Sequence, residues 1–355
     1  MFFRLVVFLF LFLISCNSPE NKKKSKDNET LKKESNLKSN NINDPVSLYK
    51  NVQNSIKIND HLSAINGLEM LLDIDPDNIK FYLEISEVYF DHLQAKETYL
   101  SFSTDSIRKQ YFEDCLWRVN NYLQTGISLD PENYKTFFLI GKSYLLRGEN
   151  EDAIKNFNQS LKVEFDQEET HLLLGFAYKA VEKYNDAIFC FKNAVNIEPQ
   201  YFEAHMQLAE IFNFLDDEIA VIHYENALKL ESENKLALFG KAWFYHKQKE
   251  WDQAIESYYN LLDVDYTHAD ANYNLGSIHL ELKNYDMARN HFADVISTYS
   301  EHYKAYYAKG YCNEVLGNVK QAEVDYKRAI EIYPDYNHAL EALRRLQNNN
   351  KKYNK

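Results

Sequence analysis

The chain has 355 residues, of which 45% are hydrophobic and 26% are charged, and its formal net charge is −13. Nine Gly and six Pro are too few for a fold built from many tight turns, such as a β-sandwich, a propeller or a collagen. The charge is uneven: Arg4 contributes +1, residues 17–44 contribute +2 and residues 351–355 contribute +3, so residues 45–350 carry −19. So acidic a body argues against nucleic acid as a partner.

The first predicted element is a signal sequence. Residues 1–4 precede an apolar run over residues 5–14, which is typical of a secretory signal and too short for a lasting membrane span. The run ends in Leu-Ile-Ser-Cys, with the Cys at position 16, and resembles the lipobox of bacterial lipoproteins. This resemblance implies a signal peptide over residues 1–15 and an acylated, palmitate-bearing Cys16. The alternatives are an ordinary signal peptide with an accidental Cys, or an uncleaved anchor.

Residues 16–44 predict a disordered polar tether. They are rich in Asn, Lys, Ser and Glu, and their large aliphatic residues are Leu31, Leu37 and Ile42. Such a segment cannot bury enough apolar surface to offset the entropy lost on ordering. As a flexible coil it would extend over about 30 Å. We therefore expect the folded part to stand away from the membrane.

An internal repeat begins at residue 45. Its clearest copy, residues 168–201, places these residues at positions 7, 8, 11, 20, 24, 27 and 32 of a 34-residue unit: Leu174, Gly175, Tyr178, Ala187, Phe191, Ala194 and Pro199. The unit resembles the tetratricopeptide repeat at every one of these positions. The same frame gives eight units, 45–78, 79–133, 134–167, 168–201, 202–234, 235–268, 269–302 and 303–336.

Three columns of the repeat predict how its helices meet. Position 20 is Ala in seven units, position 8 is Gly, Ala, Ser or Val, and position 24 is Leu, Phe or Tyr throughout. Small residues opposite large ones suit an interdigitated core. The resemblance implies an all-α, right-handed superhelical solenoid of about eight helical hairpins. Residues 337–348 predict a capping helix, and residues 349–355 form a basic tail.

Two units depart from the standard length. Unit 202–234 is one residue short around Asp216 and Asp217, and unit 79–133 has an insertion of 21 residues, roughly between His92 and Leu116. The insertion has enough Tyr, Phe and Leu for longer helices or a packed excursion, and it is either part of a binding face or a tolerated elaboration. Within it, Asp-Ser-Ile at residues 105–107 resembles an O-glycosylation acceptor, which makes Ser106 a candidate.

The sequence lacks the patterns of an active site. It has no GxGxxG, HExxH, GxSxG or CxxC, so we expect no catalytic residues, no metal and no cofactor, and we interpret the protein as not an enzyme. His279 stands at position 11, where Tyr is usual, and we expect it to be a buried, hydrogen-bonded core residue. Cys115, Cys190 and Cys312 are too widely spaced for a disulfide framework and are expected to be buried.

The family resemblance implies that the first helices of the units line a concave groove through positions 2, 5, 9 and 12. Aromatic residues at positions 5 and 9 are the candidates for peptide binding: Phe138, Phe176, Phe239, Trp243, Tyr273, Tyr307 and Tyr311. The Lys, Asn and Arg clamp of chaperone-binding members is missing. The stripe either holds a peptide with apolar anchors or packs within the array.

These features favour a membrane-anchored, non-catalytic scaffold or adaptor. It would bind proteins or peptides in the bacterial cell envelope, at the outer membrane facing the periplasm, with a lipid anchor as its membrane contact. One alternative is a self-assembling structural component of an envelope or secretion complex. Another is a protein that binds glycans or small ligands in the aromatic groove.

Overall fold

The computed structural model describes residues 44–95 and 105–353. Within these residues there are 17 helices and no strand. The expected signal peptide, the acylation site at Cys16 and most of the tether lie outside the described residues. The chain divides into two compact units, residues 1–199 and 200–355, which are described in turn.

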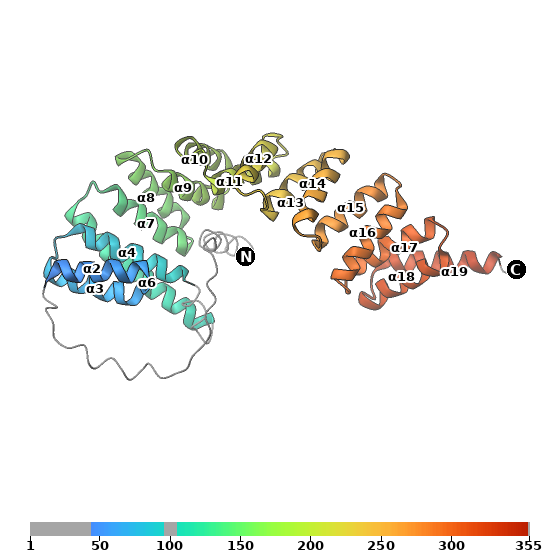
Figure 1. Cartoon of the computed structure of the whole chain (residues 1–355), viewed down its shortest axis with the longest axis horizontal. Helices are drawn as coiled ribbons and strands as arrows, with labels where there is room; N and C mark the ends of the chain where they lie inside the picture. The colour runs from blue at the N-terminus through green and yellow to red at the C-terminus, as the bar shows by residue number, and fades with distance from the viewer. Residues whose placement is uncertain (1–43, 96–104, 354–355) are drawn as a thin grey trace. The chain divides into compact units, whose positions relative to one another are not determined.

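The described part of the N-terminal unit consists of helices packed in successive antiparallel pairs (Figure 1). Each pair lies in one of the first four sequence repeats. The helices are α2 (Pro45–Lys57), α3 (His61–Ile74), α4 (Ile79–Gln94), α6 (Asp105–Leu129), α7 (Tyr134–Arg147), α8 (Asn150–Val163), α9 (Glu168–Ala180) and α10 (Tyr184–Ile197).

The C-terminal unit continues the same pattern with four pairs and a final helix (Figure 1). The helices are α11 (Phe202–Phe214), α12 (Ile219–Leu230), α13 (Lys235–Lys247), α14 (Trp251–Val264), α15 (Ala269–Glu281), α16 (Tyr285–Thr298), α17 (Tyr303–Val315), α18 (Val319–Ile332) and α19 (Asn337–Tyr353). Helix α19 packs on α18. The sequence predicted that it ends at residue 348, but the helix continues to Tyr353 and includes part of the basic tail.

The core of each unit is built from the predicted columns. The seven Ala residues at position 20 are fully buried, and the large residues at position 24 are at most 3% exposed. An ideal Cβ on Gly141 would lie 2.6 Å from the Phe157 ring, and one on Gly310 would lie 2.8 Å from the Tyr326 ring. In hairpins with an aromatic residue at position 24, position 8 therefore has to be small because the ring occupies the space beside it.

The residue at position 34 is the last of its unit and lies immediately before the first helix of the next unit. Asn234 caps α13, since its side-chain oxygen accepts a hydrogen bond from the Ala237 backbone N–H. His268 and His302 do the same through Nδ1, which lies 3.2 Å from the Ala271 nitrogen and 3.0 Å from the Ala305 nitrogen, respectively. These caps satisfy backbone donors that the helices leave unpaired.

The insertion lengthens the second hairpin. Helix α4 has 16 residues and α6 has 25, whereas the other paired helices have 12 to 14. The added part of α6 packs on α4, because Tyr111 Oη lies 2.7 Å from His92 Nε2 and Cys115 is buried. The insertion thus forms longer helices, one of the two possibilities that the sequence left open. Ser106, the candidate glycosylation residue, is exposed in the first turn of α6. No helix among the described residues combines the length and the apolar character needed to cross a membrane.

Candidate functional site

The predicted groove residues of the N-terminal unit take part in packing. Phe138 on α7 is half-buried, with its ring centroid 6.2 Å from that of Phe157. Phe176 on α9 is 9% exposed and meets Phe191 edge-on at 5.6 Å. Both residues therefore lie against the position 24 ring of their own hairpin.

Position 5 of the C-terminal unit has the same structural role. Phe239, Tyr273 and Tyr307 are half-buried, and each ring contacts two others of its own repeat, at positions 24 and 34. The contacts and their centroid distances are Phe239–Tyr258 6.0 Å, Phe239–His268 5.6 Å, Tyr273–Phe292 5.6 Å, Tyr273–His302 5.1 Å, Tyr307–Tyr326 5.8 Å and Tyr307–Tyr336 5.5 Å. These aromatic triads close the end of each repeat.

The two position 9 aromatic residues of this unit differ from each other. Tyr311 is half-buried and meets Tyr285 at 6.5 Å. Trp243 is 40% exposed, and its ring lies against His246 with a centroid distance of 5.3 Å. Among the predicted aromatic residues of this unit, Trp243 is the one that keeps a large exposed surface.

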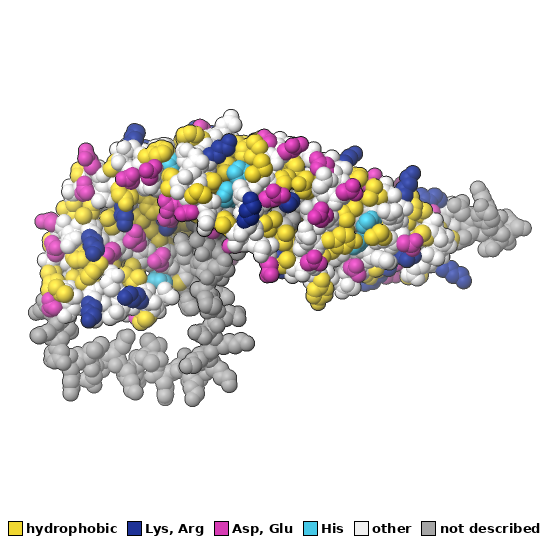
Figure 2. Space-filling view, turned by 45° about the horizontal axis from the view of Figure 1, so that its top comes forward, with side chains coloured by type: hydrophobic (Ala, Val, Ile, Leu, Met, Phe, Trp, Pro, Cys, Tyr) yellow, Lys and Arg dark blue, Asp and Glu magenta, His cyan; other side chains and the backbone are white. Residues whose placement is uncertain are grey.

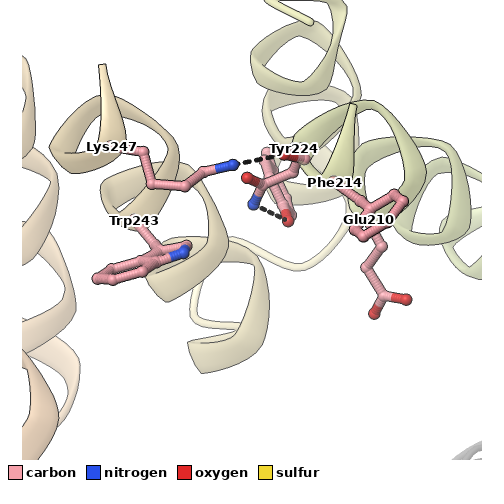
Figure 3. A pocket seen from close by; sticks show the side chains of 6 residues that line it. Glu210, Phe214, Tyr224, Trp243 and Lys247 are labelled. Atoms are coloured by element: carbon pink, nitrogen blue, oxygen red, sulfur yellow. Dashed lines mark hydrogen bonds between the residues drawn. The ribbon is translucent and has the colours of Figure 1, made fainter. Parts of the chain in front are cut away.

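Trp243 lies in a shallow hollow of the C-terminal unit (Figure 3). The hollow has a volume of ≈ 310 Å³ and lies between α11, α12 and α13. Its lining residues are Glu210, Asn213, Phe214, Tyr224, Trp243 and Lys247. Trp243 and Glu210 stand on opposite sides of it, and Lys247 points to the end of α11 (Figure 3).

A hydrogen-bond network fixes the inner wall of this hollow. Lys247 Nζ donates to the Asn213 carbonyl oxygen at 2.5 Å and to Asp216 Oδ1 at 2.6 Å. Asn213 Nδ2 in turn donates to Tyr224 Oη at 3.1 Å. Burial raises the pKa of Tyr224 to about 12, so its hydroxyl stays protonated at neutral pH. Lys247 thereby covers the carbonyl end of α11, where a positive charge is favourable.

The rim beside this wall is acidic. The short loop after α11 reads Asp216, Asp217 and Glu218, of which Asp216 and Glu218 are exposed, and Glu210 adds a half-buried carboxylate. Lys247 is paired with Asp216. On the face that Figure 2 displays, acidic and basic side chains are interspersed with apolar ones.

Sequence reasoning identified Trp243 and missed the other lining residues. Asn213 and Lys247 stand at positions 12 and 13 of successive repeats, and the interaction between them was not predicted. The one-residue shortening at Asp216 was the available signal, since a Lys in the next repeat reaches this shortened turn. The sequence alone does not show that Lys247 reaches this turn, because the two residues meet through a tertiary contact.

The buried cysteines and His279 offer no reactive group. Cys115, Cys190 and Cys312 are free and buried, as predicted, and desolvation raises the thiol pKa of Cys190 to about 12 and of Cys312 to about 11. His279 is 4% exposed, but the expected hydrogen bond was wrong: neither ring nitrogen has a partner, and the ring stacks on His291 at 5.5 Å. Among the described residues no group of three His, Cys, Asp or Glu is arranged to hold a metal ion.

Comparison with known protein families identifies the repeats. Models described as tetratricopeptide repeat match residues 168–201, 218–263, 250–296 and 303–345. These segments cover α9 and α10 and most of the C-terminal unit. The chain therefore contains tetratricopeptide repeats, and its fold is the all-α hairpin array of such repeats.

Individual relatives are distant. The chain is 29% identical over 122 residues to RNA polymerase II-associated protein 3 of Mus musculus and 27% identical to that of Homo sapiens. Each match covers 34% of this chain and 18% of the relative, so the chain spans less than a fifth of these proteins.

Solved structures with a similar fold include MamA and a complex of the APC/C. MamA 41-end from Desulfovibrio magneticus RS-1 has a TM-score of 0.44 at 18% identity, covering 48% of this chain and 96% of that one. The APC/C hetero-tetramer Cut9-Hcn1 has a TM-score of 0.40 at 16% identity, covering 81% of this chain and 52% of that one.

Proposed function

We propose that the protein is a non-catalytic adaptor that is held by a lipid on Cys16 in a bacterial cell envelope and binds a protein partner through its C-terminal unit. The observation that supports binding is the hollow with an exposed Trp243 and a fixed inner wall. Large aromatic side chains in such hollows are the residues that contribute most to protein interfaces. The repeated hairpins supply a rigid support for it.

The binding half is tested by photo-crosslinking in living cells, with the full chain carrying a crosslinker at Lys249, two residues after the lining residue Lys247, and mass spectrometry of the products. We expect Trp243→Ala to abolish the crosslinked partner. Trp117→Ala is the matched control, because Trp117 is 63% exposed on α6 of the other unit. An unchanged crosslink in Trp243→Ala, or an equal loss in Trp117→Ala, would contradict binding at the hollow.

The anchoring half has its own test. Cells grown with a radioactive fatty acid should label the full chain, and Cys16→Ser should remove the label and release the protein from the membrane fraction. More than one acyl chain is needed for stable anchoring, since each buried CH₂ contributes about 0.8 kcal/mol. If the Cys16→Ser variant stays in the membrane fraction and keeps its label, the lipid anchor is wrong. The binding of a partner is then still decided by the crosslinking experiment.

A further inference from the structure

Helices α15 and α16 of the C-terminal unit bury two stacked imidazole rings. His279 on α15 is 4% exposed, and its ring is nearly parallel to that of His291 on α16, with an interplanar angle of 4° and a centroid distance of 5.5 Å. Neither ring nitrogen of His279 has a hydrogen-bond partner among the described residues. Position 11, where His279 stands, is Tyr or Phe in five other repeats. His279 therefore packs as an aromatic ring and leaves its polar atoms unsatisfied.

The other ring of the pair is held in its neutral form. His291 Nδ1 lies 3.1 Å from Asn272 Oδ1, which can only accept, so Nδ1 carries the ring proton. The Asn272 amide group is fixed in this orientation, because its Nδ2 donates to the carbonyl oxygens of Tyr266 and His268. His291 Nε2 then accepts from the Tyr259 hydroxyl on α14, at 3.2 Å. A second proton on His291 would displace this last hydrogen bond.

Little charge is available to stabilise a proton on either ring. Desolvation by burial lowers the pKa of both rings, and a charge on His279 lowers the pKa of His291 further. Asp294, one turn further along α16, raises the pKa of His291, but its carboxylate is exposed and screened by water. Among the described residues of α14, α15, α16 and α17, no other charged group acts on either ring. The surroundings of the pair therefore fit two neutral rings.

We propose that the α15–α16 hairpin is a pH-sensitive joint of the C-terminal unit, which opens at mildly acidic pH while the α13–α14 hairpin stays folded. A third imidazole acts in the same direction, since His268 caps α15 by accepting the Ala271 N–H, and a protonated Nδ1 cannot accept. In an array of repeats each hairpin contacts only its neighbours, so one hairpin can open locally. This property of the fold holds with or without a lipid anchor or a bound partner.

Proton linkage gives the direction and the size of the effect. In the open hairpin both rings have the ordinary pKa of 6.5, and in the closed hairpin the pKa is lower, so the open form binds more protons below about pH 6.5. A ring that takes up a proton only on opening raises the opening constant about tenfold between about pH 7.5 and about pH 5.5, and two such rings raise it up to about 100-fold. The α13–α14 hairpin contains one His, His246, and is limited to about tenfold.

Hydrogen–deuterium exchange of the full chain tests the joint, with mass spectrometry at both pH values and labelling times scaled to the chemical exchange rate at each pH. We expect the opening constant of the slow amides over residues 269–298 to rise about 10- to 100-fold at the acidic pH, at least about threefold more than over residues 235–264. His279→Phe should reduce the rise over residues 269–298 at least about threefold, because one protonatable ring is lost. Tyr245→Phe makes the matched change at position 11 of α13 and should leave the rise intact.

Four results would overturn the proposal. Residues 269–298 could gain no exchange at the acidic pH, or residues 235–264 could gain as much. The gain could also persist in full in His279→Phe, or disappear in Tyr245→Phe as well. If His279→Phe fails to fold, His279→Tyr takes its place, since Tyr stands at position 11 of four other repeats and does not gain a proton in this pH range.

Discussion

At the scale of single residues, the hairpins depend on a close approach between a Gly and a large ring. Gly310 lies on α17 and Tyr326 on α18, and the Tyr326 ring is fully buried, with its hydroxyl donating to Glu314 at 2.7 Å. Its burial and this hydrogen bond restrain the Tyr326 ring where a Cβ on Gly310 would lie 2.8 Å from it. Packing here therefore limits position 8 more strictly than helix propensity does.

We expect Gly310→Ala to lower the free energy of unfolding by about 1 to 3 kcal/mol, because the new methyl group overpacks against the Tyr326 ring. Helix propensity acts in the other direction by at most about 1 kcal/mol. Urea unfolding followed by circular dichroism measures the difference. Gly126→Ala on α6 is the matched control, since its Cβ would lie 3.5 Å from Thr136, an ordinary contact. Equal effects of the two substitutions would contradict the explanation.

How well the role of a residue could be predicted from the sequence depends on how far along the chain its contacts reach. Positions 8, 20 and 24 lie within one hairpin, so their spacing already encodes which side chains meet, and Ala288 and Phe292 are buried as expected. Whether Tyr273 is free or packed depends on His302 at the end of the repeat. The hollow depends on Lys247 reaching α11 from the next repeat. The contact between Lys247 and α11 occurs at the one shortened turn and therefore has no periodic signature.

At the scale of elements, the tight turn between paired helices needs one left-handed residue. In each described hairpin with a short turn, position 15 has a φ between 57° and 81°, and two of these residues are Gly. The full set is Asn59, Gly148, Glu182, Asp216, Lys249, Lys283 and Gly317. A residue with a Cβ is strained in this conformation by about 1–2 kcal/mol.

Lys283→Gly should therefore stabilise the C-terminal unit by about 0.5 to 1 kcal/mol, because the relief of strain exceeds the larger entropy of Gly in the unfolded chain. Lys283 is exposed, and its backbone N–H, which donates to the Leu280 carbonyl oxygen, is kept. The midpoint of urea unfolding measures the gain. Gly317→Ala makes the opposite change at the next turn, where a Cβ would touch nothing, and should cost a similar amount. A lower midpoint for Lys283→Gly would refute this account of the turn.

At the scale of the whole molecule, buried histidines make stability depend on pH. Desolvation is the largest cause of a lowered pKa at His92, His171, His246, His279, His291 and His302. The unfolded chain then binds more protons than the folded one below the ordinary His pKa of 6.5. Burial raises the pKa of Glu203, which acts in the opposite direction, but only near and above its ordinary value of 4.5. His302 adds a direct effect, since a protonated Nδ1 cannot accept the Ala305 N–H.

We therefore expect the free energy of unfolding to change little between about pH 7 and about pH 8 and to fall steadily as the pH drops from about 6.5 to about 5.5, because stability is lost, as the pH falls, wherever the unfolded state binds more protons. His279→Phe should remove part of this loss. Phe212 already stacks on His223 at 5.9 Å in the equivalent place of another repeat, so a Phe fits beside His291. Urea unfolding at both ends of the pH range provides the measurement. If the stability of the parent chain is unchanged down to about pH 5.5, these rings are protonated without cost. If His279→Phe loses as much stability as the parent chain, the stacked His279–His291 pair is not a source of the pH dependence.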